Sequence, residues 1–267
     1  MSYSVCNLYS GSKGNATLIF ACGKTILIDA GKSARSLCCA LNSVGVSPES
    51  IDAIFITHEH TDHVSALQTY SHKYDTPIHI LLSSAKKKFY GLRDEKLFSS
   101  MVFHDKPNFE VNIGDVRVTS FPTPHDSCGS VGYKISFTDN GRYVNIGYAT
   151  DIGYVTDEIL DNLSGCEAIV IESNHDKEML ATGPYPYELK QRIASKHGHL
   201  SNCECASLCA ILAQKGTKSI MLAHLSEENN LPDIAYNECL MAVADPSVKI
   251  CVASPNLPIW LCKSEDK

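Results

Sequence analysis

The feature that most constrains this chain is a cluster of polar side chains directly after an apolar run. Residues 54–56 are Ile-Phe-Ile, and the next seven positions contain His58, His60, Asp62 and His63. Imidazole and carboxylate are the ligands that a borderline divalent cation such as Zn²⁺ or Mn²⁺ prefers. On a strand His58 and His60 would point the same way and could share one ion. Asp62 and His63 follow once the chain has begun to turn, so they could reach a second ion.

Length and composition indicate an ordinary globular protein. The chain has 267 residues, of which 44% are hydrophobic and 20% are charged. Without linkers or repeats, we expect one domain over residues 1–267. No apolar run is long enough for a membrane span, and the N-terminus lacks a signal-peptide pattern, so we expect a cytoplasmic protein with no membrane partner. The net charge of -7 argues mildly against nonspecific binding to nucleic acid, although two bound dications would invert the charge of a cleft locally.

The twelve cysteines are expected to stay reduced, because a chain of this length without an export signal rarely carries a disulfide framework. Cys203, Cys205 and Cys209 have a spacing that could bind a metal. They fall in a helical pattern without a partner histidine, however, and we expect a structural role. Most of the others fall in apolar segments, where a free cysteine packs as a small hydrophobic residue: Cys6, Cys22, Cys38, Cys39, Cys166, Cys239 and Cys251.

Strand and helix patterns follow one another in two similar halves. Apolar runs bounded by turn residues predict strands at residues 4–9, 16–21, 25–29, 51–57, 78–82, 168–172, 219–223 and 248–253. Turn signals at residues 114–115 and 139–141 predict hairpins over 109–121 and 131–149. Apolar periodicity predicts helices at 33–44, 64–74, 84–90, 155–163 and 234–244 and two more within 187–214. This order predicts an α/β protein, a sandwich of two sheets with helices outside, in four layers αββα.

A site for two ions needs more ligands than the first motif supplies, including one that bridges the ions. Three candidates each follow a predicted strand: His125 directly after Pro122-Thr123-Pro124, Asp151 at a glycine turn, and His224. Each alone could be a capping or core residue, but as a set at strand ends we expect them to be ligands. The loop 10–15, which contains Ser12, is either a wide turn or part of the active-site mouth, where its backbone N–H groups would bind an anion.

These residues together resemble the signature of the metallo-β-lactamase-fold hydrolases. The resemblance implies that fold and two divalent metal ions, Zn²⁺ or Mn²⁺, since histidine and carboxylate suit both. One ion would be held by His58, His60, His125 and Asp151. The second would be held by Asp62, His63, Asp151 and His224, so that Asp151 bridges the two.

Within that superfamily the chain resembles the YycJ/WalJ (VicX) family. The blocks that carry the resemblance span nearly the whole chain: residues 10–15, 57–63, 125–126, 131–133, 150–153, 172–176, 198–202 and 224–230. The resemblance implies a cytoplasmic exonuclease that digests DNA from the 5′ end and is linked to DNA repair, with repair proteins as partners. His199 also resembles the active-site histidine of phosphodiesterases such as PhnP.

The resemblance suggests a mechanism for phosphodiester hydrolysis. Two ions about 3.5–4 Å apart would lower the pKa of a bridging water, and the resulting hydroxide would attack phosphorus. We expect Asp62, Asp151 and His199 to act in catalysis, with His199 contacting the scissile phosphate or protonating the leaving oxygen; the alternative for His199 is a cap on the helix start at Ser201. His175 either binds substrate, orients a ligand or is structural. The expected substrate-binding residues are Ser12, His175 and His199.

Three functions remain compatible with these observations. The first is the DNA exonuclease, favoured by the whole-chain resemblance. The second is a small-molecule (cyclic) phosphodiesterase or a thioester or lactone hydrolase, because fold and metals do not define the substrate. The third is a non-catalytic binding protein, which the intact ligand set disfavours. Basic residues that could contact DNA, but that are more simply interpreted as solvated helix faces, are Lys86–Lys88, Lys190, Arg192 and Lys196. The remaining histidines interpreted as ordinary loop or strand residues are His72, His79 and His104.

Overall fold

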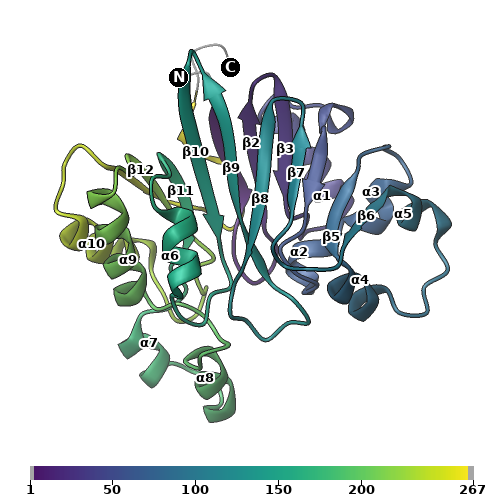
Figure 1. The fold of residues 1–267 in the computed structure, drawn as a ribbon. Coiled ribbons are helices and arrows are strands. Elements are labelled where there is room, and N and C mark those ends of the chain that lie inside the picture. Colours follow the sequence, from purple (N-terminus) through teal and green to yellow (C-terminus); the bar gives the residue numbers. More distant parts are fainter. Residues whose placement is uncertain (1–2, 264–267) are drawn as a thin grey trace.

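The computed structural model describes residues 3–263, which form two β-sheets packed face to face with helices on both outer sides (Figure 1). Each sheet has seven strands within the described residues, in the orders β14-β1-β2-β3-β4-β5-β6 and β13-β12-β11-β10-β9-β8-β7. The predicted α/β class and four-layer αββα sandwich are therefore confirmed.

The first half of the chain builds the first sheet, to which one strand from the C-terminal end is added. Its strands are β1 (Ser4–Tyr9), β2 (Ala16–Ala21), β3 (Lys24–Ile28), β4 (Ala53–Phe55), β5 (Ile78–Leu81), β6 (Met101–His104) and β14 (Ile259–Cys262). The helices of this half are α1 (Ala34–Ser43), the 3₁₀ helix η1 (Pro48–Ser50), α2 (Thr61–Val64), α3 (Leu67–Ser71), α4 (Leu82–Phe89) and α5 (Glu95–Ser100).

The second half of the chain builds the second sheet. Its strands are β7 (Glu110–Ile113), β8 (Val116–Pro122), β9 (Val131–Asp139), β10 (Arg142–Ala149), β11 (Ala168–Glu172), β12 (Ser219–Ala223) and β13 (Lys249–Val252). The helices are α6 (Asp157–Leu163), α7 (Lys177–Thr182), α8 (Tyr187–Ile193), α9 (Asn202–Gln214) and α10 (Pro232–Val243).

Most strands are buried on both faces, which explains why they appear in the sequence as continuous apolar runs rather than alternating ones. Ile26 and Ile28 of β3 face the core between the sheets, where they meet Ile135 of β9. Leu27, between them, faces the other way and packs in a cluster with Leu37 of α1. A similar cluster lies between the second sheet and α6, α9 and α10. Successive side chains on a strand point to opposite faces, so one apolar run supplies two cores.

The carboxyl ends of several strands meet at one edge of the sandwich. In the first sheet β3 and β4 are parallel, and in the second β10, β11 and β12 are parallel. The segments that follow these strands therefore come together. This is the lower edge in Figure 1, where α2, α7 and α8 also lie.

Several elements differ from the prediction. The strand expected at 51–57 is shorter, because only Ala53–Phe55 pair in the sheet, and the helix expected at 64–74 is broken into α2 and α3. Patterns at 95–104 and 259–262 predicted neither helix nor strand, although α5, β6 and β14 lie there. The two strands are at sheet edges, where one-sided burial weakens the apolar signal: β6 leaves Val102 and Phe103 exposed.

All twelve cysteines lie within residues 3–263, and none of them forms a disulfide. The expected packing in apolar surroundings is found for most, but it is wrong for Cys22 and Cys39, which are exposed. Cys22 lies in the turn after β2 with a φ of 50°, and Cys39 is on the side of α1 away from Leu37 and Leu41. Cys205 and Cys209 are buried in the core beneath α9, with their sulfur atoms 3.8 Å apart.

Across the described part of the chain, no helix combines the length and the apolar character that crossing a membrane would require.

His79 of β5 makes stability depend on pH. The residue is only 5% exposed, its ring stacks on Phe55 at 4.5 Å between centroids, and its Nδ1 lies 3.1 Å from His104 Nε2. Burial, and then the neighbouring His104, lower the pKa of His79 from 6.5 to about 4. The folded protein disfavours protonation of this ring. The contribution of His79 to the free energy of unfolding is therefore fully present above pH 6.5 and is lost as the pH falls from 6.5 towards 4.

We therefore expect wild type to lose about 2 kcal/mol more free energy of unfolding than His79→Phe between pH 7 and pH 5. Urea unfolding at both pH values measures the difference. The control is His197→Asn, which removes an exposed histidine and should lose as much stability as wild type on acidification. Equal losses in wild type and His79→Phe would contradict the prediction.

Candidate metal centre

The loop between β4 and α2 carries the predicted ligands His58 and His60, and α2 itself carries Asp62 and His63. The expectation that His58 and His60 share a face of a strand is wrong, because β4 ends at Phe55 and both residues lie in the loop before α2. The loop still brings the two rings together, with 4.5 Å between their centroids. Its start is held by Asp29, whose carboxylate accepts from the backbone N–H of Thr57 at 2.9 Å.

All seven predicted ligands face one space at the sheet edge. Three groups made up only of these ligands have ligand atoms within 4.8 Å of one another: His58, His60 and His125; His58, His63 and Asp151; Asp62, His63 and His224. A fourth group joins Asp151 and His224 to Glu172 and His199. Asp151 lies among them, with Oδ2 3.4 Å from His63 Nε2 and Oδ1 3.7 Å from His125 Nε2. Its Oδ1 is also 3.6 Å from His224 Nε2. The carboxylate of Asp151 thus contacts histidines from both predicted ligand sets.

Hydrogen bonds on the far side of the rings orient three of these histidines. His63 donates from Nδ1 to Asp29 at 2.8 Å, and His224 donates from Nδ1 to Glu172 at 3.0 Å. His125 donates from Nδ1 to the carbonyl of Gly198 at 3.1 Å. A ring that carries its proton on Nδ1 presents an unprotonated Nε2, which is the form that binds a metal.

Charges in the cluster compensate one another. Burial alone would raise the pKa of Asp151, but His224, His63 and His58 lower it well below its ordinary value. Burial alone would likewise lower the pKa of His63, but Asp29, Asp62 and Asp151 raise it well above its ordinary value. Carboxylates and imidazoles therefore lie close together in a buried site, where a charged group of either kind would destabilise the folded protein without its partner.

The residues present fit a divalent cation. His58 Nε2 and Asp151 Oδ2 are buried and have no hydrogen-bond partner among the described residues, an arrangement that needs an explanation in a folded protein. The pairs Asp62–His63 and Asp62–His224 have ligand atoms 3.3 and 3.5 Å apart. Such separations are those of neighbouring ligands around an ion with bonds of about 2.0–2.2 Å to nitrogen and oxygen.

Strained backbone turns three of the side chains towards the centre. Asp29, Asp151 and His224 follow β3, β10 and β12 and have φ values of 62°, 58° and 56°. This left-handed conformation costs about 1–3 kcal/mol for a residue other than glycine. Its use at three strand ends in one site indicates that side-chain direction matters more here than local stability.

Two acidic residues of the site were not predicted from the sequence. Asp29 and Glu172 are fully buried, and each holds a predicted ligand through Nδ1. Glu172 also accepts from the backbone N–H groups of Ile152 and Leu200, at 2.8 and 2.9 Å. The available signal was the one that identified Asp151: an acidic residue at the end of an apolar strand.

His199 belongs to this cluster. Its Nδ1 lies 2.8 Å from Glu172 Oε1 and 3.8 Å from Asp151 Oδ1. Burial would lower the pKa of His199, but Glu172 raises it above its ordinary value. The alternative of a cap on α9 is wrong, because Ser201 forms its capping box with Glu204.

The other two predicted substrate residues lie at opposite sides of His199. Ser12 is exposed and lines a cavity of about 190 Å³ with Asp126, Arg192 and His224. His175 is buried and lines a separate cavity beneath α8. His199 lines both cavities.

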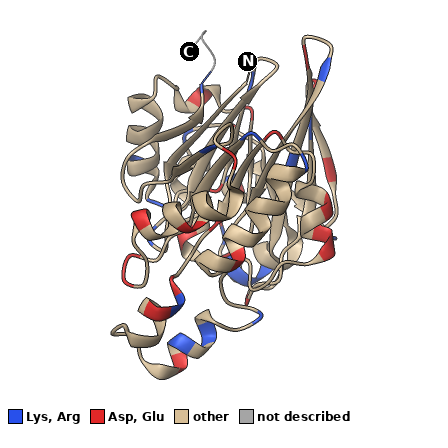
Figure 2. Ribbon diagram, turned by 90° about the vertical axis from the view of Figure 1, so that its left-hand side faces the viewer, with Lys and Arg blue, Asp and Glu red and all other residues tan. Residues whose placement is uncertain are grey.

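Basic side chains occur on two sides of the centre, and Figure 2 shows both signs of charge on the lowest lobe, formed by α7 and α8. Arg192 of α8 is paired with Asp126, and Lys190 donates to the carbonyl of Ala181 at 2.8 Å. On the other side Lys87 and Lys88 of α4 line a hollow of about 450 Å³ next to His60. The contact of Lys190, Arg192 and Lys196 with DNA stays a prediction.

Gly31 is required for the closure of the motif loop. A Cβ at this position would lie 1.5 Å from the carbonyl oxygen of Asp62 and 2.5 Å from the backbone nitrogen of Asn15. Gly31→Ala is therefore expected to lower the free energy of unfolding by about 1–3 kcal/mol, as overpacking does, and to weaken metal binding by displacing Asp62. Urea unfolding and calorimetric titration with Mn²⁺ measure the two effects.

The control for the metal-binding effect is Gly45→Ala: its φ of 77° makes alanine strained, so stability falls there too, but the added methyl group would meet no atom within 4 Å and would not displace Asp62. The control should leave metal affinity unchanged. A Gly31→Ala protein with wild-type stability and metal affinity would contradict the prediction.

Comparisons with known proteins identify the superfamily to which the chain belongs. The beta-lactamase superfamily domain matches residues 24–225. The crystal structure of the metallo-beta-lactamase fold protein YhfI from Bacillus subtilis has the same fold, with a TM-score of 0.71, 16% identity, and coverage of 97% of this chain and 99% of that one. The fold, the site and the domain match define a member of the metallo-β-lactamase superfamily, a fold that implies binding of divalent metal.

Two curated relatives define the branch. Exodeoxyribonuclease WalJ of Streptococcus pneumoniae serotype 2 (strain D39) is 33% identical over 254 residues, covering 94% of this chain and 91% of that protein. Exodeoxyribonuclease YycJ of Bacillus anthracis is 35% identical over 232 residues, covering 85% and 84%. The chain belongs to the YycJ/WalJ family.

Proposed function

We propose that this protein is a phosphodiesterase with two divalent metal ions, Zn²⁺ or Mn²⁺, that digests DNA from the 5′ end. The observation that carries the proposal is the cluster of seven histidine and aspartate side chains around one space, with the buried carboxylate of Asp151 among them. The similarity to two proteins named exodeoxyribonucleases, over 94% and 85% of the chain, supports DNA as the substrate.

The roles of the site residues follow from their surroundings. Bound divalent ions would supply Lewis-acid stabilisation of phosphate oxygens and a water of lowered pKa. The proposed ligands are His58, His60, Asp62, His63, His125, Asp151 and His224. His199, which carries a raised pKa beside Glu172, is suited to contact the scissile phosphate or to give a proton to the leaving oxygen. The residues proposed to act in catalysis are Asp62, Asp151 and His199, and those proposed to contact substrate are Ser12, His175 and His199.

The cellular setting belongs to the same proposal. The family resemblance implies an exonuclease of DNA repair, which would meet its substrate inside the cell; we therefore propose a cytoplasmic location, a role in DNA repair and repair proteins as partners. We also propose that residues 1–267 fold as one domain, since the two sheets share one core made from both halves of the chain.

The test is digestion of linear duplex DNA labelled at the 5′ or the 3′ end by the Mn²⁺-loaded protein. We expect stepwise loss of nucleotides from the 5′ end that is absent in Asp151→Ala and in the presence of a chelator. No digestion with Mn²⁺, Zn²⁺ or Mg²⁺, with metal still bound, would overturn the proposal and favour a small phosphodiester or ester substrate.

Lys87 and Lys88 are expected to contact the phosphate backbone, because they line the hollow next to His60. Charge reversal of Lys87 to glutamate should weaken DNA binding uniformly across sequences and reduce the slope of log affinity against log salt by about 1. The matched control is Lys86→Glu, a change on the same helix outside this hollow. Equal salt slopes for the two variants would contradict the contact.

A further inference from the structure

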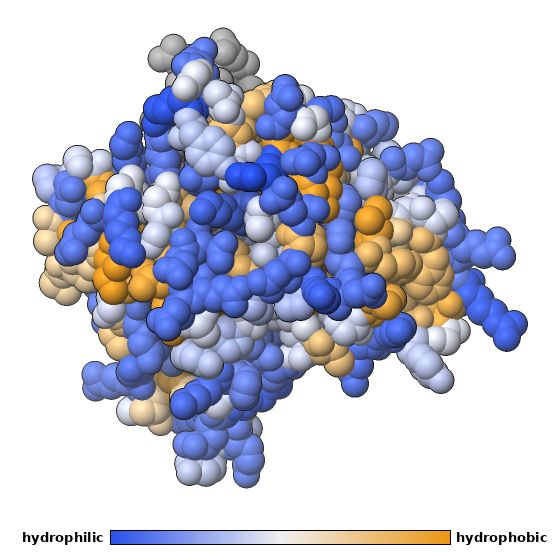
Figure 3. Space-filling view, in the orientation of Figure 1, coloured by the Kyte–Doolittle hydropathy of each residue, from blue (hydrophilic) through white to orange (hydrophobic). Residues whose placement is uncertain are grey.

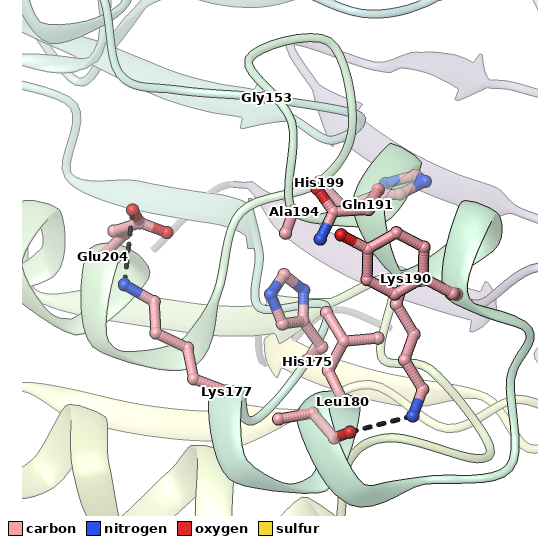
Figure 4. A pocket seen from close by; sticks show the side chains of 11 residues that line it. Gly153, His175, Lys177, Leu180, Lys190, Gln191, Ala194, His199 and Glu204 are labelled. Atoms are coloured by element: carbon pink, nitrogen blue, oxygen red, sulfur yellow. Dashed lines mark hydrogen bonds and ion pairs between the residues drawn. The ribbon is translucent and has the colours of Figure 1, made fainter.

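A cavity of about 540 Å³ lies beneath α8, between α7 and the start of α9 (Figure 4). We call it the α7–α8 pocket, and its lining includes His175, Leu180, Tyr187, Gln191 and Ala194. Hydrophilic residues cover most of the visible surface of the lobe that contains it (Figure 3). A cavity of this size is within the range of small-molecule sites and could hold one nucleotide.

The α7–α8 pocket adjoins the metal centre at His199. His199 forms part of its wall while its Nδ1 is held by Glu172, which also holds the predicted ligand His224. Gly153, two residues after Asp151, lines the pocket on the same side. A group attached to a phosphate at the metal centre would therefore enter this pocket past His199.

The lining suits a nucleobase and its sugar better than a phosphate. Both lysines at the rim are already engaged: Lys177 lies 3.5 Å from Glu204, and Lys190 donates to the carbonyl of Ala181 at 2.8 Å (Figure 4). Glu204 adds negative charge to the wall, which disfavours a free phosphate.

The other wall residues are apolar, aromatic or neutral. Leu180 is buried, whereas Tyr187 is 72% exposed, so that its side chain can stack on a base. Base–aromatic stacking tolerates any base, since each base has a π-face. The amide of Gln191 supplies both a donor and an acceptor.

His175 supplies a separate observation that indicates a ligand in the α7–α8 pocket. Its side chain lines the pocket, the residue is 3% exposed, and its buried Nδ1 has no hydrogen-bond partner among the described residues. A buried polar atom without a partner destabilises the folded protein, and a bound ligand could supply the missing hydrogen bond. Burial lowers the pKa of His175, so its ring is a neutral group that can donate or accept. No step at the metal centre requires it.

We propose that the α7–α8 pocket binds the base and sugar of the 5′-terminal nucleotide, holding that nucleotide unstacked while its phosphodiester bond lies at the metal centre. This inference rests on the proposed exonuclease function. The phosphodiester bond would lie on the metal-centre side of His199, and the base and sugar would lie on the pocket side. We assign Tyr187 to stacking and His175 and Gln191 to polar contact with the base.

The first test measures binding by titration calorimetry, with a chelator present so that no metal contributes. The probes are deoxyadenosine 3′-monophosphate, thymidine 3′-monophosphate and deoxyribose 3-phosphate, because the phosphate at the metal centre is on the 3′ oxygen of the 5′-terminal nucleotide. We expect both nucleotides to bind at least tenfold more tightly than the sugar phosphate. Ala194→Phe, which fills the pocket from an exposed position, should remove that advantage, whereas Ala194→Ser, of similar volume, should keep it. Equal affinity for all three probes, or nucleotide binding unaffected by Ala194→Phe, would overturn the inference.

The second test compares oligonucleotides with a normal and an abasic 5′-terminal residue. Wild type should show a kcat/KM about tenfold higher for the normal end, and Ala194→Phe should reduce the ratio to about one; circular dichroism checks that the variant is folded. An unchanged ratio in Ala194→Phe would refute the pocket alone. Nucleotide binding that depends on Ala194, in a protein that digests no DNA, would support the pocket and refute the exonuclease.

Discussion

Asp151→Ala is expected to lower the rate of metal-dependent DNA digestion by about a thousandfold or more. The carboxylate lies 3.4–3.7 Å from the Nε2 atoms of His63, His125 and His224, and its Oδ2 has no hydrogen-bond partner within residues 3–263. In the proposed site it is the ligand common to both ions, so its loss affects both at once. Metal centres of this type supply several kcal/mol of transition-state stabilisation, and about 4 kcal/mol corresponds to a factor of a thousand.

The measurement for Asp151→Ala is kcat/KM on labelled duplex DNA, beside the metal content of the protein by mass spectrometry. Asp151→Asn keeps the shape of the side chain but not its charge, and should also lose metal. Digestion within tenfold of wild type by either variant would show that Asp151 does not have the bridging role.

Glu172→Gln is expected to have the second large effect on metal affinity and DNA digestion, although Glu172 is not a proposed ligand. Its carboxylate accepts four hydrogen bonds: Oε1 from the rings of His199 and His224, and Oε2 from two backbone N–H groups. A glutamine has one oxygen and one NH₂ group. Its NH₂ group would therefore face either the two histidine rings or the two backbone N–H groups, which are hydrogen-bond donors themselves. If the NH₂ group faces His224, the ring must move its proton to Nε2, the atom that points to Asp62 and Asp151.

We therefore expect Glu172→Gln to reduce metal affinity and digestion about 10- to 100-fold, as changes to such outer partners typically do. Glu172→Ala should in addition cost about 3–5 kcal/mol of folding stability, because it removes one member of a buried charged group. Titration with Mn²⁺, kcat/KM and urea unfolding measure these effects.

Glu167→Gln is the matched control, because Glu167 precedes β11, the strand that Glu172 ends, and pairs with Arg142 away from the centre. Its metal affinity should equal that of wild type. If Glu172→Gln matched this control in metal affinity, Glu172 would have no part in orienting the ligands.

Local information was sufficient for the layers and for the ligand set. Strands such as Ala168–Glu172 and Ser219–Ala223 are buried on both faces, and a run of apolar residues predicts them without knowledge of their neighbours. Histidines and aspartates that directly follow such strands are visible for the same reason. Edge strands such as Met101–His104 were missed, because two exposed apolar residues break the burial pattern there.

The sequence by itself determined which residue types stand at the strand ends, and with them the class of chemistry available. Only the tertiary structure decided that His58 and His60 meet through a loop rather than on a strand, and that Asp29 and Glu172 fix the rings from behind. The same holds for the pocket between α7 and α8, whose walls come from segments that are separate in sequence. Such contacts depend on strand order and backbone direction over long separations, whereas residue type and apolar runs are local properties of the chain.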